Sequence, residues 1–516
     1  MKSRFTDKLI LLLVIFVVFI GIFSFYQSNP KYLTGDDAAI HLSKAVFNVN
    51  KASVNYINPF KPFSEEPAYG NLYIDEFPFH VLVSGIMLST GTDVISATKV
   101  VIFVLQIFLF IGLFLFLECI FRDRMFSFLA AFFAMFSYWI AIMYFEGTYA
   151  QIMGMVFIPF YLLLVNDYFN KKNNPSLIGA IAINGLLFFV HPLTFIFVCV
   201  LSFSYLLYFL VLNKKYIVLA LLIIATVVIL IVIALFPNLP YPKFYSGNIT
   251  DNPSFELKDF YGKLISGLSP YIILGLFVAG IVSSLKSKKI VLIALLISYL
   301  FISSETFGVP FFPHRFNPYF MVLVIITVFY GFKELFIRIK NYRLAYLLLV
   351  LFFIVISVGV VYSFQAVKEA HVHFSKGLSP AIITDNDYAA LSWIKENIPG
   401  DETILATNKW GYFVPSLAEH TVLLGDSFEL HDVEKKDLKN RQEIAQQNGH
   451  AVFRETDSRV KAELLQSIGV KYIFVPDQMR KYISDYAPYE IYNTDFDSKY
   501  FSVFYKRGDA IVYKLR

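Results

Sequence analysis

Cysteine and charged residues are both scarce in this 516-residue chain, and each scarcity excludes a class of protein. Only two cysteines occur, Cys119 at the end of an apolar run and Cys199 inside another, which leaves neither a disulfide framework nor a cysteine-based metal site. Charged residues make up 16% of the chain, against about 25% in soluble domains, while hydrophobic residues make up 57%. The composition therefore excludes a soluble enzyme.

The charges are unevenly distributed along the chain. Residues 1–365 contain 25 Lys and Arg with 17 Asp and Glu, whereas residues 366–516 contain 19 and 22. The first region is predicted to be a membrane domain and the second a soluble domain. The basic excess of the membrane domain reflects loop topology rather than a nucleic-acid surface, so no nucleic-acid partner is expected.

The fold predicted for the whole chain is a polytopic α-helical membrane protein with about eleven spans and a C-terminal soluble α/β domain. A bilayer-spanning helix needs about 20 apolar residues. The first run is kept as an uncleaved span, because no small-residue cleavage site follows it. The eleven runs are approximately 9–28, 96–121, 125–145, 148–168, 176–190, 193–212, 216–236, 268–285, 290–304, 317–332 and 344–365.

Segment 79–90 decides the topology, since counting it as a twelfth span reverses every later loop. With eleven spans and a cytoplasmic N-terminus, the inner segments carry sixteen Lys and Arg residues, and the much longer outer segments before residue 366 carry nine. This asymmetry is the one expected of a membrane protein. Segment 79–90 is therefore interpreted as a short helix at the outer leaflet within a first outer loop, residues 29–94, and the C-terminal domain is predicted to be extracytoplasmic.

The first outer loop contains the most informative pattern, TGDDAAIHLSKAVFNVN. A helix from Asp36 places Ala38, Leu42, Ala45, Val46 and Val49 on one apolar stripe, typical of a helix lying on a membrane surface. Asp37, His41, Lys44 and Asn48 fall on another stripe, where carboxylate, imidazole and ammonium groups are neighbours. The pattern also fits a helix cap at Asp36 or Asp37 with a surface pair between Asp37 and His41.

Further polar residues are predicted to lie on the same outer face. Glu146 in YFEGTY either binds sugar hydroxyls or ends a helix before Gly147, and His191 before Pro192 is either a ligand-binding residue or a turn residue. His314 and Arg315 precede a span, where the planar guanidinium of Arg315 matches a phosphate or extends to lipid headgroups. His80 belongs to the same set of outer residues.

The C-terminal domain alternates helical and strand patterns. DNDYAALSWIKENI and VKAELLQSIG indicate helices, ETILAT and VKYIFVP indicate strands, and the last residues, YFSVFYKRGDAIVYKLR, indicate a hairpin. The domain contains no Gly-rich phosphate loop, nucleophile elbow or paired metal-ligand histidines, so a binding or shaping role over the membrane site is expected.

Taken in order, these motifs resemble the GT-C superfamily of integral membrane glycosyltransferases, especially prokaryotic members with an outward C-terminal domain. The resemblance spans nearly the whole chain, and includes the tail phrases ALSWIKENIPGDETILA and LLQSIGVKYIFV. It rests on GDDAAIH (Asp36, Asp37, His41), FPFHVL (Pro78, His80), EGTYAQ (Glu146, Gly147), HP (His191, Pro192) and PHRFNPY (His314, Arg315).

The resemblance implies a polyprenyl-phosphate-linked sugar donor and a glycan, lipid or protein acceptor. It also implies that an acidic residue of the first outer loop is the general base and that a basic residue near the bilayer surface holds the lipid phosphate. These roles map to Asp36 or Asp37 and to Arg315. The tail lacks a WWDYG-like motif, which argues against transfer of a whole glycan to asparagine. No spacing requires a cofactor or metal, although the acidic cluster is chemically suited to a divalent ion.

Two other classes remain open at the level of sequence. A transporter or lipid-linked glycan flippase is typified by polar or broken helices at the midplane and by repeated halves, and neither pattern is found here. A non-catalytic surface protein that anchors envelope glycans is the third hypothesis.

Overall fold

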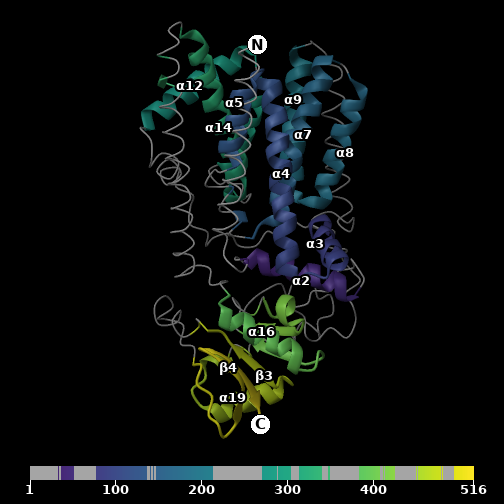
Figure 1. Cartoon of the computed structure of the whole chain (residues 1–516), viewed down its shortest axis with the longest axis vertical. Coiled ribbons are helices and arrows are strands. Elements are labelled where there is room, and N and C mark those ends of the chain that lie inside the picture. Colours follow the sequence, from purple (N-terminus) through teal and green to yellow (C-terminus); the bar gives the residue numbers. More distant parts are fainter. Residues whose placement is uncertain are drawn as a thin grey trace. The chain divides into compact units, whose positions relative to one another are not determined.

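The computed structural model describes residues 33, 36–51, 77–135, 140, 143–144, 147–171, 173–212, 270–287, 289–303, 313–339, 344, 347–348, 383–406, 411, 413–424, 449, 451–477, 479 and 493–516. The chain forms two compact units (Figure 1). The first unit consists of Met1–Gly21, Phe103–Met143 and Ala150–Val367. The second consists of Ile22–Ile102, Tyr144–Tyr149 and Lys368–Arg516.

The described part of the first unit is built from apolar helices. These are α4 (Val94–Phe121), whose first residues belong to the second unit, α5 (Arg124–Met135), α7 (Tyr149–Lys171), α8 (Asn174–Val190), α9 (Pro192–Leu212), α12 (Pro270–Ser287), α13 (Lys289–Ile302) and α14 (Pro313–Arg338). Four described helices are long and apolar enough to cross a membrane: Val94–Phe121, Tyr149–Phe169, Pro192–Val211 and Arg315–Arg338.

Helices lie at eight of the eleven predicted runs. Runs 9–28 and 216–236, and most of 344–365, lie outside the described residues, so the count of eleven spans stays a prediction. The boundary expected at His191 is confirmed: its backbone is extended (φ −163°, ψ 109°), and Pro192 begins α9. Proline disfavours the helical conformation of the residue before it, which explains this break.

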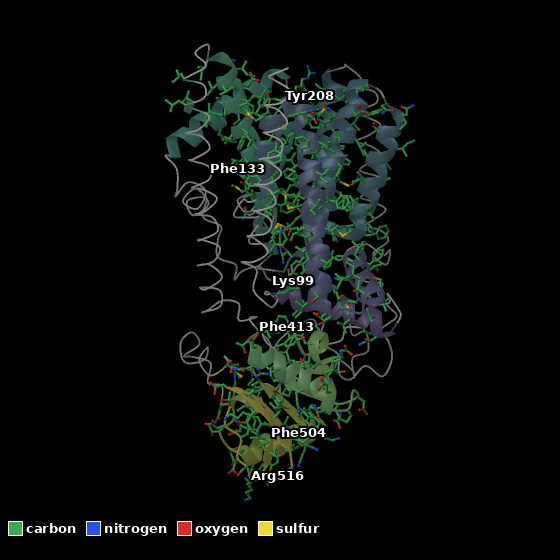
Figure 2. All side chains as sticks on the ribbon, viewed as in Figure 1. Lys99, Phe133, Tyr208, Phe413, Phe504 and Arg516 are labelled. Atoms are coloured by element: carbon green, nitrogen blue, oxygen red, sulfur yellow. The ribbon has the colours of Figure 1, made fainter. Side chains whose placement is uncertain are left out.

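Helix α14 packs against α5, α12 and α13 in the first unit, and α9 packs against α8 and α13. The crossing of α12 and α14 is close, because a Cβ placed on Gly331 would lie 2.0 Å from the Leu276 carbonyl oxygen. Aromatic rings fill the contact with α5, where Phe133 (labelled in Figure 2) stacks on Phe329 with ring centroids 5.6 Å apart. Glycine at the crossing and aromatics elsewhere therefore fix α14 among its neighbours.

The N-terminal part of the second unit contains α2 (Asp36–Lys51) and α3 (Phe77–Thr90), which pack against each other. The predicted apolar stripe of α2 is confirmed as its buried face: Ala38, Leu42 and Ala45 have no exposed surface. Ser84 of α3 donates a hydrogen bond of 3.0 Å to the Ala45 carbonyl oxygen. Helix α3 has 14 residues, shorter than the roughly 20 needed for a span, as the short-helix interpretation requires.

The C-terminal part of the second unit is a five-stranded sheet in the order β2-β1-β3-β5-β4. Its elements are α16 (Asp385–Asn397), β1 (Thr403–Ala406), the π-helical turn η4 (Val414–Ala418), β2 (Thr421–Leu424), α19 (Ser458–Ser467), β3 (Tyr472–Val475), β4 (Phe501–Arg507) and β5 (Ala510–Leu515). Strand β1 pairs in parallel with β2 and β3, and β5 pairs antiparallel with β3 and β4. Helix α16 contacts β4 and β5 (Figure 1). Trp393 of this helix stacks on Tyr505 and meets Phe504 edge-on.

The helices, strands and hairpin expected in this part of the chain are all present. Helix α16 begins with a capping box, in which the Thr384 side chain accepts from the Asp387 amide and the Asp387 carboxylate accepts from the Thr384 amide. Helix α19 is followed by Gly469 in the left-handed region (φ +68°), as its sequence predicts. Strand β2 and turn η4 were not expected. They matter because η4 packs against α2 and so joins this region to the first outer loop.

Candidate functional site

A cluster of buried polar side chains lies where α2, α3 and the start of α7 meet in the second unit. We call it the histidine cluster and define it as Asp37 and His41 of α2, His80 of α3 and Tyr149 of α7. His41, His80 and Tyr149 have exposed fractions of 5%, 0% and 0%. Asp37 is half-buried. The cluster thus gathers residues from the first outer loop and from the EGTY segment more than 60 residues later.

The two imidazoles of the cluster are directly hydrogen-bonded. The distance from His41 Nδ1 to His80 Nε2 is 2.8 Å, and the ring centroids are 5.1 Å apart. One nitrogen must donate and the other accept, so the pair cannot carry a proton on both of these atoms. Burial lowers the pKa of His80 well below 6.5, and the positive charges of His41 and Lys44 lower it further. His80 is therefore neutral at physiological pH.

His41 is buried, so it is not the surface residue that a surface pair between Asp37 and His41 requires. Its ring is covered by Phe79, with centroids 5.5 Å apart, and by Tyr149, with centroids 5.8 Å apart. Helical periodicity placed His41 on the polar face of α2, but α3 packs over that part of the face. A buried imidazole held by another imidazole has a fixed orientation, which a surface side chain lacks.

The turn before α7 is pressed against the first turn of α2. Gly147 has a positive φ of +81°, and a Cβ at this position would lie only 2.2 Å from the Ala38 amide nitrogen. Glycine is needed both for the backbone conformation and for the close approach. The contact explains how Tyr149, two residues after Gly147, reaches the residues around Asp37.

A second buried polar network lies in the first unit and contains His191. His191 Nδ1 is 2.8 Å from Thr194 Oγ1, which is 2.6 Å from the Tyr319 hydroxyl. The Thr194 amide at the start of α9 also donates a hydrogen bond of 3.2 Å to His191 Nδ1, and the three side chains are at most 6% exposed. His191 thus ends α8, which is the turn role weighed above, and its ring belongs to a polar network that reaches α14. A ligand-binding role for His191 stays a prediction.

Arg315 lies at the start of α14 and is half-buried. The Gln151 side chain of α7 donates a hydrogen bond of 2.5 Å to the Arg315 carbonyl oxygen. Arg315 is therefore held through its own backbone, one turn before Tyr319.

Several predicted site residues cannot be placed in either arrangement. Glu146 lies outside the described residues, and the side chains of Asp36 and His314 are likewise not described, although α2 begins at Asp36 and α14 includes His314. Among the residues that the structure describes, no group of three or more His, Cys, Asp and Glu side chains could hold a metal ion.

Four residues of these arrangements were not anticipated: Gln151, Thr194, Tyr319 and Tyr149. Gln151 and Thr194 are polar residues inside apolar runs. Such residues indicate a buried polar contact, because an unpaired polar group inside a membrane lowers stability. Tyr149 follows the Gly147 turn directly, and its aromatic ring alone did not distinguish it from the many other aromatic residues of the chain.

The fold is similar to those of several solved structures. The Archaeoglobus fulgidus oligosaccharyltransferase tethered with an acceptor peptide aligns with a TM-score of 0.59 at 12% identity, covering 92% of this chain and 70% of that one. The ArnT protein of Cupriavidus metallidurans bound to undecaprenyl phosphate aligns with a TM-score of 0.55 at 12% identity, covering 98% and 97%. The archaeal enzyme was also solved with an inhibitory peptide and a dolichol-phosphate (TM-score 0.55, 13% identity, 92% and 70% covered).

At these identities the likeness concerns the fold, and it agrees with the GT-C resemblance noted in the sequence. No curated protein matches this chain. The apolar helices and the membrane-protein fold together make it an integral membrane protein. A family model described as a family of unknown function matches residues 4–516. The chain therefore belongs, over nearly its entire length, to the family DUF6541.

Proposed function

We propose that this protein is a membrane glycosyltransferase that moves a sugar from a polyprenyl-phosphate-linked donor to an acceptor on the extracytoplasmic side of the membrane. The observation that carries the proposal is the histidine cluster, which fixes the acidic motif of the first outer loop beside buried imidazoles in a chain with the GT-C fold. A structural cluster alone would be expected to be apolar, because burying polar groups lowers stability unless they are fully paired.

Asp37 is proposed as the general base, with Asp36 as the alternative. The acceptor hydroxyl oxygen attacks the anomeric carbon of the sugar, and its proton passes to the carboxylate. Asp37 shares its helix face with His41 and Lys44, so positive charge nearby favours the ionised carboxylate. Asp36 begins α2, where a carboxylate is also favoured by the helix dipole.

Arg315 is proposed to bind the departing lipid phosphate. As the bond between the anomeric carbon and the phosphate oxygen breaks, the electron pair and its negative charge move to the phosphate. A guanidinium group offers two parallel hydrogen bonds to such a group. The hydrogen bond from Gln151 to the Arg315 carbonyl would keep α14 from shifting as this charge develops.

The remaining predicted residues are given binding roles. His41, His80, His191 and His314, together with Glu146, are proposed to contact or orient the sugar and its acceptor, because they were predicted from the sequence to lie on the same outer face. We also propose that a divalent metal ion can assist near Asp36 and Asp37. Adding a chelator to the transfer assay tests this proposal.

The decisive experiment compares Asp36→Asn and Asp37→Asn at matched expression in a strain lacking the native protein, with transfer of radiolabelled sugar from membrane lipid as the readout. A general base contributes roughly 10²–10⁴-fold to the rate, so one variant should lose nearly all transfer and still bind a polyprenyl-phosphate analogue. Glu396→Gln, which changes an exposed carboxylate of α16, is the matched control and should keep full activity. Full activity in both aspartate variants would reject this mechanism and favour a transporter or flippase.

A further inference from the structure

The Tyr149 hydroxyl is buried in the histidine cluster and makes no hydrogen bond with any residue that the structure describes. A buried hydroxyl without a partner costs stability, and phenylalanine would fill the same space without this cost. Most buried polar groups in proteins are paired, so an exception requires an explanation. The explanation must come from a group that the hydroxyl meets in another state of the protein.

The position of the Tyr149 ring is fixed by three separate contacts. The ring lies 5.8 Å from that of His41 and 5.7 Å from that of Phe79, measured between centroids. Its own amide donates a hydrogen bond of 2.8 Å to the Gly147 carbonyl oxygen, and Gly147 is pressed against Ala38. The hydroxyl therefore cannot move far to find a partner, and the partner must come to it.

Asp37 is the candidate partner. It directly precedes Ala38, the residue that Gly147 contacts, and the negative charge of its carboxylate acts on the Tyr149 hydroxyl. Asp37 is half-buried at the first turn of α2, whereas the tyrosine is fully buried. A carboxylate has several acceptor positions and can accept from a phenol while receiving a second proton donor.

We propose that the Tyr149 hydroxyl donates a hydrogen bond to the Asp37 carboxylate when substrate is bound, which makes Tyr149 the residue that positions the general base. This inference rests on the proposed function. One carboxylate oxygen accepts from Tyr149, and the other faces the acceptor hydroxyl. The acceptor proton moves to that second oxygen, the acceptor oxygen bonds to the anomeric carbon, and the phosphate leaves with the electron pair. The phenol keeps its proton throughout.

The test is the pH dependence of transfer by Tyr149→Phe. A hydrogen bond from a neutral donor favours the ionised carboxylate, so its loss makes the base easier to protonate. The acidic limb of the rate profile should therefore move to higher pH by about one unit, which corresponds to about 1.4 kcal/mol for the lost hydrogen bond. At a given pH on that limb, transfer by the variant should be about tenfold lower than transfer by the wild type. The other charged or titratable groups facing Asp37 are unchanged by the substitution: His41 and Lys44 on α2, and His80 on α3.

Purified full-length protein is assayed from about pH 5 to about pH 9 with a lipid extract from a strain that lacks it and was grown on radiolabelled sugar, so that the lipid-linked donor itself carries the label. Thermal unfolding of the ligand-free protein is the second readout, and Tyr149→Phe should leave its midpoint unchanged or raise it. The matched control is Tyr161→Phe on the same helix, because the Tyr161 hydroxyl is bonded to Ser202. This control should lower the midpoint and leave the pH profile as in the wild type.

Two results would overturn the inference. A wild-type pH profile in Tyr149→Phe would remove Tyr149 from the base, and a lowered midpoint would show that its hydroxyl already makes a stabilising bond in the free protein. The proposed function fails separately, when Asp36→Asn and Asp37→Asn both keep full transfer. If Asp37→Asn is inactive and Tyr149→Phe follows the wild-type profile, only the inference about Tyr149 is lost.

Discussion

His41 and His80, 39 residues apart in the chain, are joined by a hydrogen bond of 2.8 Å between their imidazole rings. The bond connects α2, which carries the acidic motif, to α3, the helix whose sequence was ambiguous between a span and a surface segment. Because His80 is buried, this bond also makes the packing of α2 and α3 sensitive to protonation.

The folded state should lose stability as the pH falls below about 6.5. The pKa of His80 is lowered by burial and then by His41 and Lys44, whereas the unfolded chain takes up this proton near pH 6.5. Below that pH the unfolded state binds more protons, so the free energy of unfolding decreases by up to about 1.4 kcal/mol per pH unit. Thermal unfolding of purified wild type and His80→Gln between about pH 5 and about pH 8 measures this slope.

His80→Gln keeps a hydrogen-bonding side chain but cannot take up the proton. Its midpoint should therefore depend less on pH than that of the wild type, whatever its absolute value. Identical slopes in the two proteins would show that His80 does not contribute to the acid sensitivity.

The crossing of α12 and α14 should not tolerate a side chain. A Cβ on Gly331 would lie 2.0 Å from the Leu276 carbonyl oxygen, so Gly331→Ala forces two backbones apart and should cost about 1–3 kcal/mol or more. Gly275→Ala on α12 is the control, since nothing lies within 4 Å of its Cβ position. The control should be neutral or stabilising by up to about 1 kcal/mol, because alanine favours helices. Unfolding midpoints in detergent compare the two variants, and equal loss in both would contradict the close crossing.

Arg315→Lys should weaken binding of a polyprenyl-phosphate analogue although the charge is kept. Lysine lacks the planar pair of donors, and loss of one charge-assisted hydrogen bond corresponds to about tenfold in affinity. Binding to purified protein is the measurement, with Arg338→Lys at the exposed end of the same helix as the control. Equal affinity in wild type and Arg315→Ala would exclude Arg315 from the phosphate site.

The first outer loop and the C-terminal domain should be accessible from the same side of the membrane. Single cysteines at Ser64 and Ser458, in a background without Cys119 and Cys199, should both react with a membrane-impermeant maleimide in intact cells. The reason is the excess of Lys and Arg in the inner segments of the eleven-span topology. Labelling at Ser64 with protection at Ser458 would instead establish twelve spans.

The sequence by itself determined most of the described helices and strands, with β2 and η4 as exceptions. Long apolar runs predicted the helices of the membrane domain, because a bilayer requires apolar length and internal backbone hydrogen bonds. In the C-terminal part, Gly469 and the segment before Pro399 marked helix ends, since both act through local backbone geometry. The apolar stripe of α2 was predicted for the same reason: periodicity along one helix reports which face is buried.

Only the tertiary structure decided which elements meet. Periodicity placed His41 on the polar face of α2 but contains no information about a partner helix, so its burial against His80 and Tyr149 could not be read from spacing. The approach of Gly147 to Ala38 and the bond between Thr194 and Tyr319 are likewise long-range contacts. They depend on how helices pack as three-dimensional surfaces, where complementary shape and paired polar groups select one arrangement from the many that the same helices allow.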